Sequence, residues 1–204
     1  MMARTRLMKQ SIVHAARSAW QLPASRLLCV LGLAAATLAA SPQDWVRATA
    51  EVRRLDPSVF TQLPAEIVTY LHERRCTIPQ PFDADRARGA VSGHFISAAQ
   101  LDWAVLCSVD DVSAILVFRS GGTSHVDELA RRPDREDLQV IDGRQRIGYS
   151  RDISVATPKD IQRYGRHASI TRLDHDGIED AFLEKASTIH YWDRGRWLAV
   201  HGSN

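Results

Sequence analysis

The sequence predicts an α+β domain in which an N-terminal helical segment packs on a mostly antiparallel β-sheet built from hairpins. Two observations indicate this class. Residues 43–77 carry apolar side chains at helical spacing, whereas after residue 100 the apolar residues come in short runs bounded by polar ones. About 164 residues follow the N-terminal leader, which is enough for one domain with its own core. We therefore expect a single extracytoplasmic domain over residues 41–204.

The first 40 residues predict a secretory signal peptide. They hold five Lys or Arg and no Asp or Glu, and they end in an apolar run from Leu27 to Ala40 with small residues at its exit. This run of about 14 residues is shorter than the roughly 20 that a membrane-spanning helix needs. We expect cleavage after Ala39 or Ala40 and a periplasmic or secreted product. The alternative is an uncleaved leader, which would be the chain's only contact with a membrane.

Removal of the leader would change the sign of the net charge. The full chain has 26 basic and 24 acidic residues, a formal net charge of +2. Residues 41–204 have 21 basic and 24 acidic residues, a net charge of −3. Nucleic-acid binding requires a basic face, so the composition argues against a nucleic-acid partner, and the partner stays unknown.

Cys76 and Cys107 are the two cysteines that follow the leader. In an oxidising compartment an even count predicts a disulfide. A loop of this length would stabilise the fold by roughly 3–4 kcal/mol in the chain-entropy model. The alternatives are a thiol nucleophile or half of a metal site.

The first elements are expected to be helical. One helical stripe carries Leu63, Ile67, Tyr70 and Leu71. Asp56, Pro57 and Ser58 are typical of a cap that opens a short earlier turn. Pro79 and Pro81 prevent the helix from continuing.

A hairpin is expected next, with strands at residues 103–107 and 114–118 and a loop at 108–113. Both runs are apolar on both faces, which predicts a hairpin covered on two sides. Cys107 lies in this hairpin, so the disulfide would join the helical segment to the sheet. Residues 120–136 predict a loop with at most one short helix.

Three elements are expected in the C-terminal part. Asp142-Gly143 between residues 138–141 and 147–149 predicts a second hairpin. A short helix should begin after the N-cap Thr157 and run to Tyr164, ending at Gly165. The final hairpin should pair residues 181–192 with 196–200.

Residues 93–105, Gly-His-Phe-Ile-Ser-Ala-Ala-Gln-Leu-Asp-Trp-Ala-Val, resemble one repeat of the FG-GAP (integrin-type propeller) family. The matching residues are Gly93, Phe95, Asp102, Ala104 and Val105. The resemblance implies a strand–loop–strand. Family members bind calcium through acids and Asn in the loop, where this chain has His94, Ile96 and Ala98. A hard cation needs about six or more oxygen ligands, so we expect no metal in this loop.

A second stretch, residues 174–180, has the carboxylates that the first lacks. Asp174, Asp176 and Asp180 around Gly177 form the one candidate calcium site; the alternative is a polar turn. Aligning Asp102 with Asp180 places residues 113–118 beside 187–192, which indicates a weak duplication of one hairpin unit. Two copies are too few for a full propeller.

Most of residues 60–200 is also similar to a group of uncharacterised secreted bacterial proteins. The segments that carry this similarity are residues 63–80, 101–108, 115–118 and 177–187. The resemblance implies export, and it implies no catalytic or binding site.

Motifs for catalysis are weak. The sequence has no Gly-x-Ser-x-Gly, no Walker loop and no His-Glu-x-x-His. Ser120 and the pair Ser124-His125 would need a base and an orienting acid close in space to act as a hydrolase. Trp192 and Trp197 flank the final turn and either form an exposed binding platform or pack across the strands. We expect a non-catalytic binding or interaction module without a cofactor; the alternative is a secreted hydrolase with an unrecognised site.

Overall fold

The computed structural model describes residues 40–142, 146–165 and 173–203, all of which belong to one compact unit. The predicted signal peptide and its cleavage site therefore lie outside the described residues, apart from Ala40. The α-helices are α1 (Pro42–Ala50), α2 (Ala65–Glu73) and α3 (Pro158–Tyr164). The strands are β1 (Arg54–Leu55), β2 (Ile78–Pro79), β3 (Ala90–Gly93), β4 (Asp102–Val109), β5 (Val112–Phe118), β6 (Val126–Pro133), β7 (Leu138–Val140), β8 (Ile147–Tyr149), β9 (Arg151–Ala156), β10 (Gly177–Phe182), β11 (Ala186–Asp193) and β12 (Arg196–His201).

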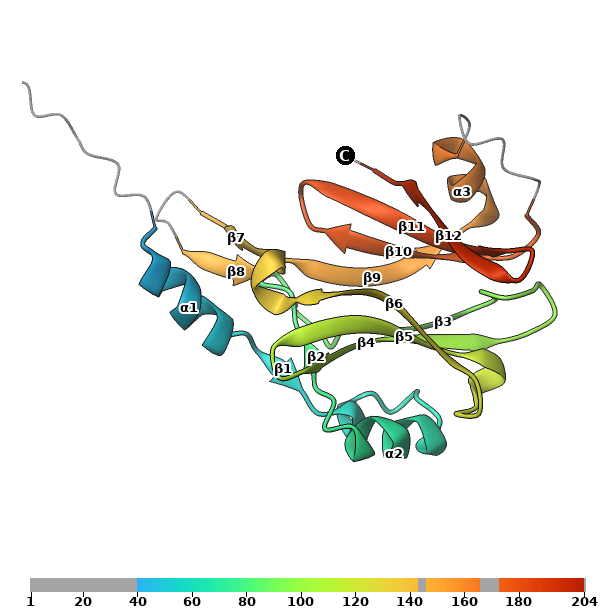
Figure 1. Ribbon diagram of the computed structural model, residues 1–204, viewed down its shortest axis with the longest axis horizontal. Coiled ribbons are helices and arrows are strands. Elements are labelled where there is room, and N and C mark those ends of the chain that lie inside the picture. The colour runs from blue at the N-terminus through green and yellow to red at the C-terminus, as the bar shows by residue number, and fades with distance from the viewer. Residues whose placement is uncertain (1–39, 143–145, 166–172, 204) are drawn as a thin grey trace, which may run out of the picture. The chain divides into compact units, whose positions relative to one another are not determined.

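Two four-stranded antiparallel sheets form two layers, as Figure 1 shows. The first sheet has the order β3-β4-β5-β6, and the second has the order β9-β10-β11-β12. Each is a meander in which neighbours in sequence are neighbours in space. Two small two-stranded sheets, β1-β2 and β7-β8, complete the strands of the described residues. The α+β class that the sequence predicts is confirmed.

The central hairpin β4–β5 is covered on both faces, as its apolar pattern predicts. Successive strand residues point to opposite faces. One set, including Leu106 and Val117, packs against Ile153 and Ile178 of the second sheet. The other set includes Val105 and packs under α2. The turn of the β4–β5 hairpin is the residue pair Asp110-Asp111, both with positive φ. The two strands are therefore longer than the sequence predicts.

The N-terminal segment is less helical than expected. The helix α1 begins at a capping box formed by Ser41 and Asp44. It ends at Ala50, and the chain then forms β1 and one 3₁₀ turn (Pro57–Val59) before α2. The cap predicted at this turn is present, because the side chain of Asp56 accepts a hydrogen bond from the Ser58 N–H. The segment predicted as helical over residues 43–77 is therefore interrupted by β1, which pairs with β2.

The loop predicted at residues 120–136 was also wrong. Residues Val126–Pro133 form β6, which pairs antiparallel with β5. This edge strand is rich in charged residues, so its sequence lacks an apolar alternation. A register shift opposite Ser113–Ile115 accompanies the positive φ of Ala130. Charges, a bulge and a terminal Pro133 are the features that protect a sheet edge from further pairing.

The C-terminal elements follow the prediction with one correction. The β7–β8 pair and α3 are confirmed, and Thr157 and Asp160 form a capping box at α3. The predicted turn at residues 142–143 lies partly outside the described residues. Residues 181–192 do not form one strand, because a turn with a positive φ at Glu184 separates β10 from β11. The final hairpin β11–β12 is confirmed.

Candidate functional site

A groove lies on the outer face of the first sheet, beyond the part that α2 covers. Its volume is about 240 Å³. Ten residues line it, namely Tyr70, Arg74, Cys107, Val109, Val112, Ala114, Leu116, Val126, Glu128 and Arg131. The first two come from the end of α2, and the others come from β4, β5 and β6. The groove is thus bounded by the helix on one side and the edge strand on the other.

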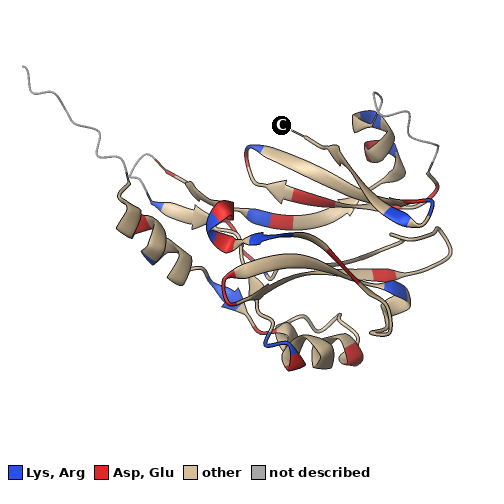
Figure 2. Cartoon of the chain, in the orientation of Figure 1, with Lys and Arg blue, Asp and Glu red and all other residues tan. Residues whose placement is uncertain are grey.

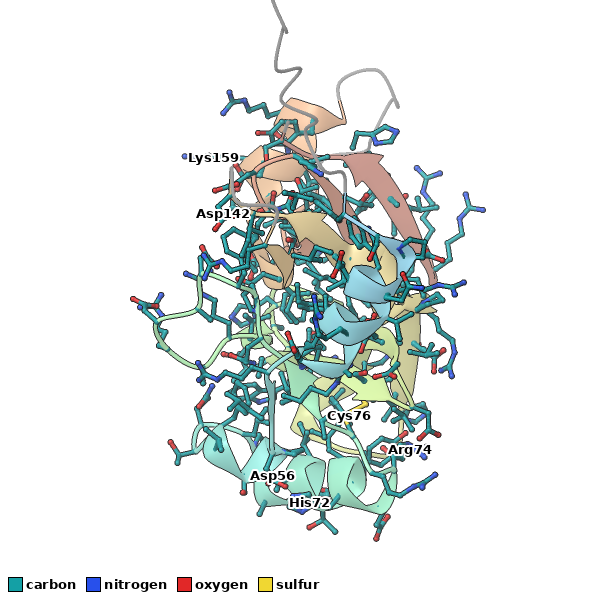
Figure 3. The ribbon with its side chains drawn as sticks, turned by 90° about the vertical axis from the view of Figure 1, so that its left-hand side faces the viewer. Asp56, His72, Arg74, Cys76, Asp142 and Lys159 are labelled. Carbon is teal, nitrogen blue, oxygen red and sulfur yellow. A yellow bond between two sulfur atoms is a disulfide. The ribbon has the colours of Figure 1, made fainter. Side chains whose placement is uncertain are left out.

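The groove exists because α2 stops short. Arg75 adopts a left-handed conformation with φ 55°. Its N–H bonds to the carbonyl of His72, and the N–H of Cys76 bonds to the carbonyl of Leu71, which is the Schellman pattern of helix termination. The next link is covalent, since Cys76 forms the predicted disulfide with Cys107 of β4, with 5.4 Å between their Cα atoms. Figure 3 shows Arg74 and Cys76 next to each other at this helix end.

The groove has an apolar floor and a polar rim. Five residues form the floor, namely Val109, Val112, Ala114, Leu116 and Val126. At the rim, Arg131 pairs with Glu128 at 3.2 Å, and both side chains are about half exposed. The guanidinium carbon of Arg74 lies 4.0 Å from the centre of the Tyr70 ring, and Tyr70 in turn packs edge-on against Phe118. Among the described residues, no carboxylate forms an ion pair with Arg74.

The second sheet has a comparable open region of different chemistry. Its helix α3 covers one part of the outer face through Ile161, which packs with Ile189 and Tyr191. The uncovered part forms a pocket of about 410 Å³, lined by apolar residues such as Phe182 and Leu183 as well as by charged ones. There the carboxylate of Glu179 accepts hydrogen bonds from the hydroxyls of Ser154 and Ser203.

A network of ion pairs is buried between the two sheets. Arg151 of β9 is fully buried, and its guanidinium forms two hydrogen bonds with Asp180 of β10, at 2.8 and 3.0 Å. Arg132 of β6 reaches Asp180 at 2.9 Å and also holds Asp137. The remaining donors of Arg151 bond to the Ser113 hydroxyl and the Ala130 carbonyl. Figure 2 shows these charges on β6, β9, β10 and the turn after β6.

The network shifts the pKa values of its members in opposite directions. Burial disfavours the charged form of Asp180, but Arg151 and Arg132 outweigh it and lower the pKa of this carboxyl below its usual value. Burial raises the pKa of Asp137 despite its contact with Arg132. For Arg132, burial is the largest single effect and acts to lower the pKa, but its two carboxylate partners raise it above the ordinary value. These charges therefore hold one another in place.

Another buried carboxylate, outside this network, belongs to Asp134. Its Oδ2 accepts hydrogen bonds from Arg54 at 2.8 Å and from the Ser108 hydroxyl at 2.6 Å. This contact joins the β1 strand to the end of β6. Its Oδ1 has no hydrogen-bond partner among the described residues.

The three aspartates predicted as calcium ligands are not brought together as one ligand set. Asp180 pairs with the two arginines. Asp174 is exposed and bonds to His175 at 3.0 Å. Asp176 accepts a hydrogen bond from the N–H of His94 at 3.0 Å, and its own N–H bonds to the His94 carbonyl. In the described part of the chain, no group of three or more His, Cys, Asp or Glu side chains could hold a metal ion.

The FG-GAP-like loop at residues 94–101 is held by Asp102, in addition to the contacts of Asp176 with His94. Its buried carboxylate accepts hydrogen bonds from the N–H groups of Phe95 and Ile96, each at 3.0 Å, and from the N–H of Ser120 at 2.9 Å. Asp102 thus takes two main-chain donors of the loop, and Asp176 takes a third, the His94 N–H. The family relation itself stays a prediction.

Trp192 and Trp197 face each other across the last hairpin. Their rings are 5.6 Å apart in an edge-on arrangement. Trp197 packs against the core between the sheets, and Arg119, in the 3₁₀ turn after β5, lies over the ring of Trp192 at 4.3 Å. The pair is partly buried, as cross-strand packing requires.

The hydrolase alternative rested on Ser120, Ser124 and His125. The Ser124 hydroxyl lies 3.3 Å from Nδ1 of His125, and both residues are exposed. The main-chain N–H of Ser120 bonds to Asp102. Among the described residues, no carboxylate bonds to His125, so the geometry shows no orienting acid.

The chain matches no family model, no curated protein and no solved structure. In the part of the chain that the structure describes, no helix is long and apolar enough to cross a membrane.

Sequence reasoning missed the groove. Of the floor residues, Ala114 and Leu116 fell in a predicted strand, whereas Val109, Val112 and Val126 fell in the predicted loops at 108–113 and 120–136. The sequence did contain a signal for the groove. A hairpin that is apolar on both faces needs a packing layer on each face. The N-terminal segment offers only nine residues of helix, α2, for the outer one.

Proposed function

We propose that the protein is an exported, non-catalytic binding module that holds a small ligand in the groove beside α2. The observation that carries the proposal is the groove itself, a hollow of about 240 Å³ between the end of α2 and the edge strand β6. An apolar pocket with a few polar groups at its rim is the usual form of a small-molecule site.

The groove is also held in shape before any ligand arrives. The Schellman termination and the Cys76–Cys107 disulfide fix the end of α2 against β4. The opposite wall belongs to β6, which Arg132 ties to the second sheet. A preformed site loses little conformational freedom on binding, which favours affinity.

Export is supported by the disulfide and by the basic, apolar leader of the sequence. Disulfides persist in oxidising compartments.

A neutral fluorescent probe, N-phenyl-1-naphthylamine, tests the proposal. We expect the folded protein to enhance its fluorescence, and Val112→Asp to remove the enhancement because it places a charge on the floor. The matched control is Val140→Asp, which makes the same change at an exposed residue of β7. Circular dichroism checks that both variants fold, and Val112→Thr serves if the Asp variant does not. Equal probe binding by wild type and all variants, or no binding at all, contradicts the proposal.

A further inference from the structure

We propose that two copies of the chain associate through β12, which pairs antiparallel with β12 of the other copy and joins the two second sheets into one. Each copy contributes four strands to the joined sheet. This contact lies on the second sheet and is independent of the groove beside α2, so it goes beyond the proposed function. Its basis is the row of main-chain groups that β12 leaves unpaired.

The strand β12 is an edge of the second sheet, and within the described residues it pairs with β11 alone (Figure 1). The turn between the two strands is the pair Arg194-Gly195, both with positive φ. This is the type I′ turn of a two-residue hairpin. The residues on either side of such a turn, here Asp193 and Arg196, form a hydrogen-bonded pair.

This first pair decides which main-chain groups of β12 point outward, because hydrogen-bonded pairs alternate along antiparallel strands. Leu198 and Val200 bond to β11. The N–H and C=O groups of Trp197, Ala199 and His201 therefore point to the open edge. Among the described residues, no group bonds to these outward donors and acceptors. An edge of this kind is a template for a further strand.

The other edges of the two large sheets are protected, and β12 is not. The edge strand β6 is charged, has a register shift and ends in Pro133, and β3 has only four residues. The strand β9 has β3 beside it, and its Asp152 pairs with Arg88 at 3.4 Å. The strand β12 has six residues and no proline, and it pairs with β11 without a register shift. It therefore lacks the usual devices that prevent pairing with another chain.

The outward groups also define the register of a symmetric pair. Two copies related by a two-fold axis present the same strand to each other. Ala199 is the middle one of the three outward residues, so all of their donors and acceptors are used when Ala199 lies opposite Ala199 of the second copy. Trp197 then lies opposite His201 of the second copy. Ala199 is small and exposed, so the strands can approach each other at the axis.

The side chains of β12 suit this register. Leu198 and Val200 are partly buried and pack against the apolar cluster under α3. Pairing would place Leu198 beside Val200 of the second copy, so the apolar layer would continue across the contact and lose exposed surface. Arg196 would lie opposite Gly202 of the second copy, which keeps the two arginines apart. Residues 41–204 have a net charge of only −3, so repulsion between copies is weak.

Sedimentation velocity of the purified protein over a range of concentrations tests the inference. We expect a monomer–dimer equilibrium. Ala199→Lys should weaken it by about fivefold, because like charges then face each other across the axis, and Ala199→Glu should do the same. A mixture of these two variants should restore association, because opposite charges then meet. The matched control is Val155→Lys, which adds the same charge at an exposed residue of β9, the other edge of the sheet, and should change nothing.

Amide hydrogen exchange measures the same contact residue by residue. The N–H groups of Trp197, Ala199 and His201 should exchange more slowly as the protein concentration rises. The N–H of Leu198 should not change, because it bonds to β11 in the monomer and in the dimer. Circular dichroism checks that each variant folds.

A protein that stays monomeric up to its solubility limit overturns the inference, and so does a dimer that Val155→Lys weakens and Ala199→Lys does not. Failure of the mixed Ala199 variants to associate overturns the pairing of Ala199 with itself. Protection of the outward amides only in the presence of another protein would assign the edge to that partner instead. Probe binding in the groove tests the proposed function separately, since none of these substitutions lies there.

Discussion

The two four-stranded sheets share one plan and differ in what they leave open. Each is an antiparallel meander with one α-helix on its outer face, and each exposes the part that its helix does not reach. On the second sheet the exposed part is mixed, with Phe182 and Leu183 near Glu179, which bonds to two serine hydroxyls. On the first sheet it is the apolar floor of the groove. The groove of the first sheet differs in having one wall fixed by the Cys76–Cys107 disulfide and the other by the ion pair of Arg132 with Asp180, and for this reason we propose binding there.

A second contrast lies on the second strand of each meander. Asp102 and Asp180 are both buried aspartates. Asp102 is stabilised by uncharged N–H groups of its own loop and of the turn at Ser120. Asp180 is stabilised by two arginines from β6 and β9. One carboxylate organises a loop, and the other joins two sheets, so their removal should have different consequences.

The largest effect is expected from Asp180→Asn. It leaves the fully buried Arg151 with an uncompensated charge, which should lower the free energy of unfolding by about 3–5 kcal/mol. Asp102→Asn removes one acceptor oxygen from the uncharged N–H groups that bond to Asp102. This should lower the free energy of unfolding by about 1–3 kcal/mol. Urea denaturation measures both. Equal losses would mean that the two aspartates play the same part.

Loss of the disulfide should rank next and should distinguish the two helices. Cys76→Ser with Cys107→Ser opens a link of sequence separation 31, and we expect a loss of about 2–4 kcal/mol. Only α2 is stapled to its sheet; α3 is held by apolar contacts such as those of Ile161. Amide hydrogen exchange under native conditions should therefore accelerate in α2 and not in α3. Equal acceleration in both helices would contradict this contrast.

A smaller effect should come from His190, a histidine of the second sheet with no counterpart in β3–β6. Burial lowers its pKa below the ordinary value of 6.5, Asp180 acts to raise it, and Arg151 and Arg132 act to lower it further. The unfolded chain therefore takes up a proton that the folded chain resists. Stability should fall as the pH drops through 6.5, by at most about 1.4 kcal/mol per pH unit. His190→Gln should remove this component, and an unchanged pH profile would refute it.

The smallest effect is expected from calcium. The arginines already neutralise Asp180, so millimolar calcium should not shift the melting temperature. A shift that disappears in Asp176→Ala would instead support the ligand set that the sequence indicates. A shift that survives in Asp176→Ala would place a calcium site elsewhere in the chain.

Local patterns in the sequence predicted much of the fold. The hairpin β4–β5, the capped helix α3, the cap at Asp56 and the Cys76–Cys107 bond each depend on spacing, turn residues or cysteine count. Such signals act between residues close in sequence, or, for two cysteines in an oxidising compartment, leave one pairing. The strand β6 escaped this reasoning because its charged residues become a strand only when β5 lies beside them.

The sequence by itself determined the α+β class, the hairpins and the covalent link between α2 and the sheet. Only the tertiary structure decided what Asp180 does, because its partners lie 29 and 48 residues away in the chain. A carboxylate such as that of Asp180 can bind calcium or form an ion pair. Its contacts with Arg132 and Arg151 in the folded chain determine that it forms ion pairs. The groove was also decided only by the tertiary structure, because it depends on how far the helix α2 extends over the first sheet. The spacing of residues along the chain does not show how much of a sheet a helix covers.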